Sequence, residues 1–67
     1  MNKDLLRMYM IKNGDTYTTL AKHIGISAVS FSNKINETGS EFRQGEISKI
    51  KNRYDLSPKE VDAIFFN

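Results

Sequence analysis

The segment from residue 17 to residue 35, YTTLAKHIGISAVSFSNKI, constrains the fold more than any other part of this chain. Its apolar residues recur at helical spacing on both sides of Gly25, the residue best able to adopt the positive φ of a tight turn. Ala21 is small, as required where a second helix crosses close above it. The segment therefore predicts two short helices that meet across a turn. The apolar positions that define the two faces are Leu20, Ala21, Ile24, Phe31 and Ile35.

The rest of the chain is also patterned for short helices. Good N-cap residues precede three of them, and a proline and a capping-box glutamate follow the serine of SPKE, at residues 57–60. A polar connection, Asn36 to Glu41, separates the third helix from the fourth, and Phe42 is expected to anchor it in the core. We therefore predict an all-α, compact five-helix domain that spans residues 1–67. The expected helices run from about Lys3 to Lys12, after Thr16, after Ser27, from about Gln44 to Tyr54, and after Ser57.

Length and composition limit the classes of protein that this chain can represent. A chain of 67 residues has room for one small core, and without cysteine it has neither disulfides nor thiolate metal sites. Its longest apolar run is too short to cross a bilayer, and charged residues interrupt its N-terminal region, so we expect no membrane segment and a cytoplasmic location. Residues 1–36 carry five Lys or Arg against two Asp or Glu, so one basic face is expected.

The residues that predict the paired helices also resemble a known family. KNGDTYTTLAKHIGIS and FSNKINETGSEFRQGEISKIKNRYDLSPKEVDAIFF resemble the two halves of the phage repressor and Cro superfamily, the lambda-repressor-like helix-turn-helix domains. The likeness covers most of the chain and is strongest to small regulators from temperate phages of Gram-positive bacteria. Family members often have Gln in place of Tyr17 and an apolar residue in place of Lys34. The second difference suggests that Ile35 replaces Lys34 as the core contact.

The resemblance implies that the third helix enters the major groove of operator DNA. Its outward residues are found by removing the core contacts Phe31 and Ile35. An asparagine there suits paired hydrogen bonds to adenine, and small apolar side chains suit thymine methyl groups, so A·T-containing steps are expected. The alternative is an ordinary exposed helix of small residues. The candidate base-reading residues are Ser27, Ala28, Val29, Ser32, Asn33 and Asn36.

Family geometry also places the start of the second helix and the connection after the third along the DNA backbone. Polar and basic residues in these segments are the expected phosphate contacts, and solvated surface is the alternative for each of them. The candidate phosphate-contacting residues are Tyr17, Thr18, Lys22, Lys34, Thr38, Ser40, Arg43 and Gln44.

Phe66 is out of phase with the apolar face of the last helix, which Val61, Ile64 and Phe65 form. It is therefore expected either to leave the core and contact a second copy or a cognate repressor, or to fold back as a terminal plug.

The favoured function is a Cro-like or repressor-like transcription regulator of a phage lysis–lysogeny switch, which binds double-stranded operator DNA as a homodimer. The alternative is an antirepressor or modulator that binds the cognate phage repressor protein. No catalytic set, cofactor, metal or small-molecule substrate is expected. His23, the single histidine, is expected on an exposed helix face, and the acidic residues are more simply capping or solubilising groups.

Overall fold

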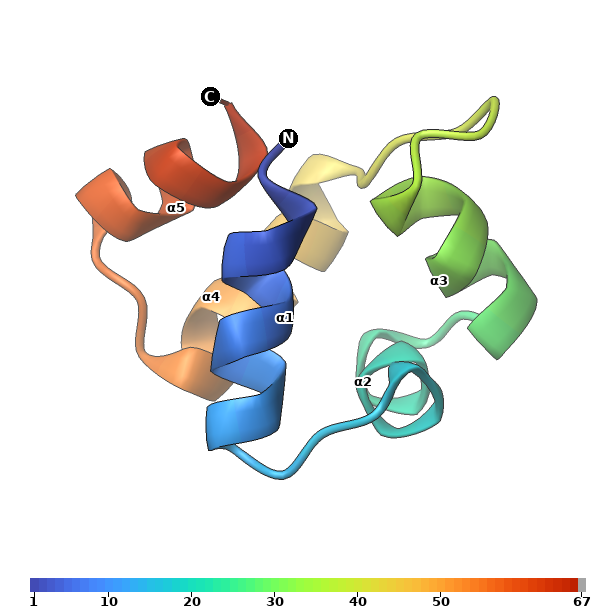
Figure 1. The fold of residues 1–67 in the computed structure, drawn as a ribbon, viewed down its shortest axis with the longest axis horizontal. Coiled ribbons are helices and arrows are strands. Elements are labelled where there is room, and N and C mark those ends of the chain that lie inside the picture. The colour runs from blue at the N-terminus through green and yellow to red at the C-terminus, as the bar shows by residue number, and fades with distance from the viewer. Residues whose placement is uncertain (67) are drawn as a thin grey trace.

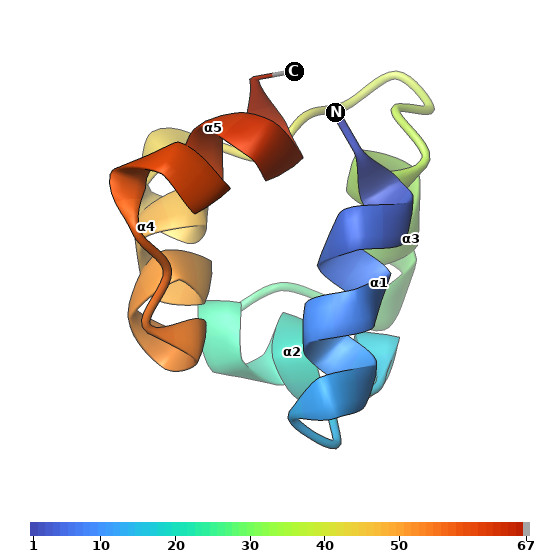
Figure 2. The same cartoon turned by 60° about the vertical axis from the view of Figure 1, so that its left-hand side comes forward.

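The computed structural model describes residues 1–66, and the predicted all-α, five-helix architecture is confirmed in this part of the chain (Figures 1 and 2). The N-terminus and the end of α5 lie near each other, and the Asn2 amide donates to the Ile64 carbonyl at 2.6 Å. Within residues 1–66, no helix is both long enough and apolar enough to cross a membrane. The helices are α1 Lys3–Lys12, α2 Tyr17–Ile24, α3 Ala28–Ile35, α4 Gln44–Tyr54 and α5 Pro58–Phe65.

Local capping explains where the helices begin. The side chains of Thr16, Ser27 and Ser57 accept the third amide of α2, α3 and α5, as their sequence positions predict. Asn2 caps α1 in the same way. At α4 the capping is one-sided, because Glu46 reaches back to accept from the Arg43 amide at 2.9 Å.

Four helices, α1 to α4, are followed within two residues by a left-handed residue: Gly14, Gly25, Glu37 and Asp55. At the end of α2, Gly25 has a φ of 84°, and the following Ile26 amide donates to the Ala21 carbonyl at 3.0 Å. A Cβ atom added at Gly25 would meet no atom beyond the neighbouring residues within 4 Å, so backbone conformation rather than space favours glycine there. At the end of α4, Asp55 has a φ of 52°, and the Leu56 amide closes the same kind of hydrogen bond to the Lys51 carbonyl.

One apolar core joins all five helices, and a run of aromatic rings passes through it. Phe31 of α3 is fully buried; its ring centroid lies 5.0 Å from that of Tyr17 and 5.4 Å from that of Phe42. The ring centroid of Phe42 in turn lies 5.8 Å from that of Phe65 of α5, so Phe42 anchors the α3–α4 connection as expected. The buried residues are Leu6, Met10, Leu20, Ala21, Ile24, Phe31, Ile35, Phe42, Ile50, Leu56, Val61 and Ile64.

The boundary of the core does not follow apolar spacing alone. Leu5 and Tyr9 adjoin the buried residues Leu6 and Met10 along α1, yet they are only half-buried. The Tyr9 hydroxyl donates to Glu60, so its ring stays at the edge of the core. Leu56 is buried although no helical period marks it, because the left-handed turn at Asp55 directs the chain back over α4.

A polar cluster ties the α1–α2 loop to the end of α4. The Asp15 side chain is only 3% exposed, and its two oxygens accept hydrogen bonds from Thr19, Arg53 and Tyr54. The bidentate Arg53 pair, at 2.7 Å for both bonds, holds the pKa of Asp15 well below its usual range and outweighs the opposing effect of burial.

Leu20→Ala is expected to lower the free energy of unfolding by about 2 to 5 kcal/mol, because Leu20 is fully buried and its loss leaves a cavity. That is a large part of the stability of so small a domain. Thermal and urea unfolding followed by circular dichroism measure the loss. A nearly neutral Leu20→Ala would contradict the position of α2 in the core.

Asp15→Asn is expected to lower the free energy of unfolding by about 1 to 3 kcal/mol at neutral pH, because Arg53 loses its charged partner. Since the pKa of Asp15 is lowered on folding, its contribution is present above the unfolded value of about 3.9 and is lost as the pH falls below it. The difference in stability between wild type and Asp15→Asn should therefore shrink with acidification below about pH 4. Asp4→Asn is the matched control: Asp4 is 84% exposed, and its change should be within about 0.5 kcal/mol at every pH. A constant difference between wild type and Asp15→Asn across this range would contradict the ionised Asp15 cluster.

Candidate nucleic-acid interface

The α2–α3 pair presents one side of α3 to solvent. Phe31 and Ile35 turn inward and are buried, which confirms Ile35 as the core contact, while Val29 is 72% exposed. Val29, Asn33 and Asn36 are spaced by four and then three residues, so they share the outward face. Figure 1 shows α3 at the edge of the molecule, away from α5.

The structure divides the candidate base-reading residues into two groups. Ala28, Val29 and Asn33 are exposed along α3. The other three candidates already contact protein atoms. The Ser27 hydroxyl caps α3 by accepting from the Ser30 amide at 3.0 Å, and half-buried Ser32 accepts from the Asn36 side-chain amide at 3.5 Å.

Lys3 of α1 was not among the candidates, yet it lies at the C-terminal end of the exposed α3 face. Its ammonium donates to the Asn36 side-chain oxygen at 3.3 Å. A positive charge thus lies beside the last candidate base reader. The excess of basic residues in the first half of the chain predicts a cation near the site. It does not identify Lys3, because only the fold brings α1 to the end of α3.

Arg7, one turn further along α1, is the second residue that the sequence did not single out. Its Nε and Nη2 atoms donate to the Tyr17 hydroxyl at 2.9 and 2.7 Å. The Tyr17 ring packs on Phe31, so this guanidinium is fixed beside the first residue of α2. A ligand that reaches the Tyr17 hydroxyl at the start of α2 would therefore also meet the Arg7 guanidinium, and we call the two side chains the Arg7–Tyr17 unit.

Within residues 1–66, Lys34, unlike the other predicted phosphate contacts, forms an ion pair with an acidic side chain of another helix. Its ammonium donates to both carboxylate oxygens of Glu46, at 2.7 and 2.9 Å, and the two side chains are 12% and 13% exposed. Burial raises the pKa of Glu46, but the Arg43 amide and Lys34 together outweigh it, so the pKa lies below its ordinary value. This ion pair joins α3 to α4, and a phosphate would have to compete with Glu46 for Lys34.

The remaining candidate phosphate contacts lie on the surface. Ser40 is half-buried and belongs to the loop that leaves α3 in Figure 1. The others are exposed, in the first and last turns of α2, in the same loop, and at the start of α4: Thr18, Lys22, Thr38, Arg43 and Gln44.

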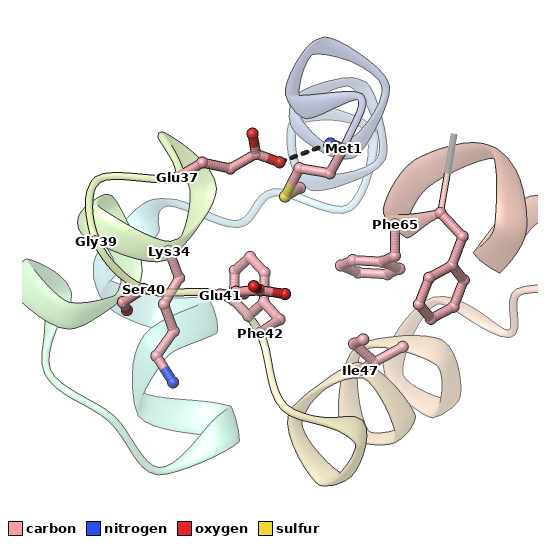
Figure 3. A pocket seen from close by; sticks show the side chains of 10 residues that line it. Met1, Lys34, Glu37, Gly39, Ser40, Glu41, Phe42, Ile47 and Phe65 are labelled. Carbon is pink, nitrogen blue, oxygen red and sulfur yellow. Dashed lines mark hydrogen bonds and ion pairs between the residues drawn. The ribbon is translucent and has the colours of Figure 1, made fainter.

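A separate hollow of about 450 Å³ lies between the N-terminus, the α3–α4 connection and the end of α5 (Figure 3). Phe42, Ile47 and Phe65 line it, and Phe66, 65% exposed, lies at it as well. At its rim the N-terminal amine pairs with Glu37 at 2.6 Å. Of the two alternatives expected for Phe66, departure from the core is the one that agrees with this exposure, while its partner stays a prediction.

His23 is exposed on α2, as its position predicts. Among residues 1–66, no three His, Asp or Glu side chains gather in a way that would hold a metal ion. Comparison of the chain with protein-family models, with curated proteins and with solved structures finds no match.

Proposed function

We propose that this chain is a sequence-specific DNA-binding regulator that places α3, the second helix of a helix-turn-helix, in the major groove of an operator. The observation that supports this most directly is the exposed α3 face bordered by cations from α1. Lys3 lies at the C-terminal end of that face, and the Arg7–Tyr17 unit lies beside the start of α2. A small exposed helix with positive charge beside it fits base edges flanked by phosphates.

The residues on α3 suggest which bases are read. Asn33 suits adenine N6 and N7, and the exposed methyl groups of Ala28 and Val29 suit thymine. α3 contains neither Arg nor Gln, so it lacks the commonest contact to guanine. Direct discrimination is therefore modest and favours A·T steps, and groove shape supplies part of the selectivity.

Binding as a homodimer compensates for a small reading surface. Two copies on a pseudo-palindrome, with half-sites about 34 Å apart or a multiple of that distance, gain affinity that one copy lacks. Such a dimer would act by occluding a promoter of a phage lysis–lysogeny switch.

Selection from a randomised duplex library by the purified chain tests the proposal. Enrichment of an A·T-containing inverted repeat supports it. Recovery of unenriched sequences, or no retained DNA at moderate salt, would count against sequence-specific binding.

A second candidate function rests on Phe66. Phe66 is exposed beside a hollow, so an apolar side chain of a partner protein could fill the hollow while the partner covers the Phe66 ring. We propose as the alternative that the chain is an antirepressor that binds its cognate phage repressor. Gel shifts of the DNA beside its own gene, with this chain alone, the neighbouring repressor alone, and both, separate the two functions.

Asn33→Ala is expected to reduce the ratio of affinities for selected and random duplex, because it removes a base contact worth about 1 to 3 kcal/mol. Lys22→Ala, Arg43→Ala and Arg7→Ala should instead weaken both duplexes and lower the salt slope by about one unit for each lost phosphate contact. Fluorescence anisotropy across a salt series measures both quantities.

Lys59→Ala is the matched control for lost charge, since exposed Lys59 lies at the start of α5. It should leave the salt slope nearly unchanged. Lys34→Ala is a poorer probe, because it also leaves Glu46 without its partner in a mostly buried position. Equal losses on both duplexes for Asn33→Ala would show that Asn33 does not read bases.

Phe66→Ser is expected to weaken binding to the cognate repressor by about one to two orders of magnitude while the helical signal is retained, because an exposed phenylalanine buried at an interface contributes about 1.5 to 3 kcal/mol. Val29→Ser is the matched control: Val29 is 72% exposed, close to the 65% of Phe66, but lies on α3 and does not line the hollow. Isothermal calorimetry with the purified repressor compares them. Unchanged binding together with a thermal midpoint lowered by several degrees would identify Phe66 as an intramolecular plug.

A further inference from the structure

The outward side of α1 is an apolar face that the core does not use. Leu6 and Met10, 0% and 3% exposed, turn inward, whereas Met8 and Ile11 are 65% and 77% exposed. Leu5 lies half-buried at its border. Exposed aliphatic side chains one turn apart on a short helix form a contiguous patch rather than isolated contacts with water.

The shape of this face combines a ridge with hollows. Ile11 stands between a hollow of about 400 Å³, which α1 alone forms, and one of about 280 Å³, which extends to Asp15 and Tyr17. A protruding side chain beside a hollow is the shape that lets two identical surfaces interlock. The first hollow is lined by Leu5, Met8, Tyr9, Ile11 and Lys12.

The charges along the face are also self-complementary. Asp4, Met8 and Lys12 follow one another at intervals of four residues, so they form one stripe with an acid at its N-terminal end and a base at its C-terminal end. Asp4 is 84% exposed, and its only cation contact in residues 1–66 is Arg7 at 3.8 Å. A second, antiparallel copy of the stripe brings Lys12 to Asp4 at both ends. A parallel copy would bring like charges together.

We propose that the partner of this face is a second copy of the chain, with α1 packed antiparallel on α1 about a two-fold axis near Met8. Each Ile11 enters the α1 hollow of the other copy, and two Asp4–Lys12 pairs close the ends. So small a face gives weak, concentration-dependent association. The inference goes beyond the proposed function, because it assigns the pairing surface and requires no DNA; it leaves α3 and the Phe66 hollow uncovered.

A charge-exchange experiment tests the pairing. Asp4→Lys sets two ammonium groups against each other at each end of the interface, and Lys12→Glu sets two carboxylates against each other. Each variant alone should therefore be more monomeric than wild type in sedimentation equilibrium at low salt. The two variants are then mixed in equal amounts. The stripe of Asp4→Lys carries an ammonium group at both ends, and the stripe of Lys12→Glu carries a carboxylate at both ends.

The outcome of mixing depends on which copy supplies each charge. In a mixed dimer, the introduced lysine of Asp4→Lys meets the introduced glutamate of Lys12→Glu at one end, and the native Lys12 meets the native Asp4 at the other. Both ends then carry opposite charges, so a heterodimer should form. The double variant Asp4→Lys/Lys12→Glu should also regain association. Circular dichroism and thermal midpoints identify any loss of association that comes from loss of fold.

Neutral substitutions locate the face independently. Ile11→Ser should raise the dissociation constant of self-association about tenfold or more. Val29→Ser is its matched control, because Val29 is 72% exposed but lies on α3, and it should leave self-association unchanged. A folded, monomeric wild type at millimolar concentration, no heterodimer on mixing, or a loss from Val29→Ser or Phe66→Ser but not Ile11→Ser would overturn the proposal. Since all these measurements lack DNA, a monomer that binds operator overturns this inference alone, and a dimer that binds none overturns the proposed function alone.

Discussion

The Asp15 cluster is the polar constraint on which the arrangement of the helices depends. It joins the residue that precedes the α2 cap to Arg53 and Tyr54 at the end of α4, across 38 and 39 positions in the chain. A carboxylate that is almost fully covered is stable only when its oxygens are well supplied with donors, and here Thr19 supplies another. The position of α2 relative to α4 is therefore set by directed hydrogen bonds as well as by apolar contact. Because α3 follows α2 across a tight turn, the orientation of the exposed α3 face depends on the same cluster.

The helices and the turn between α2 and α3 could be predicted from the sequence, because their determinants are local. Ser57 and Pro58 specify the start of α5 within a few residues, and Gly25 with Ala21 specifies the turn that ends α2. Periodicity also places Phe31 and Ile35 in the core, since the inward side of a short helix follows directly from its spacing.

The polar contacts of the candidate site could not be predicted in the same way. Lys34 has the sequence signature of a surface lysine, and only the packing of α3 against α4 shows that Glu46 meets it. Arg7 and Lys3 have no local pattern that points to Tyr17 or Asn36, because those contacts arise only when the fold brings α1 beside the start of α2 and the end of α3. The burial of Leu56 was not predicted either. The left-handed turn before it is formed by an aspartate, Asp55, rather than by a glycine, the residue that usually indicates such a turn.

The proposed roles divide this small surface among different elements. We propose the outward side of α3 for DNA, the hollow beside Phe66 for a protein partner, and the outward side of α1 for a second copy. Each helix of eight to eleven residues has one side in the core, so a single exposed side remains available for each contact. Separate surfaces allow self-association and DNA binding to be altered one at a time by substitution.

The aromatic run from Tyr17 through Phe31 and Phe42 to Phe65 has a consequence for how the molecule opens. Local opening is inexpensive only where a segment leaves without exposing much shared core. α2, α3, the α3–α4 connection and α5 each contribute one ring to this run, so detaching any of them uncovers a ring of its neighbour. The buried amides of these helices should consequently exchange with solvent hydrogen through one common, global opening. The cell then meets either the whole domain or an unfolded chain open to proteolysis, and the lifetime of such a domain follows its overall free energy of unfolding.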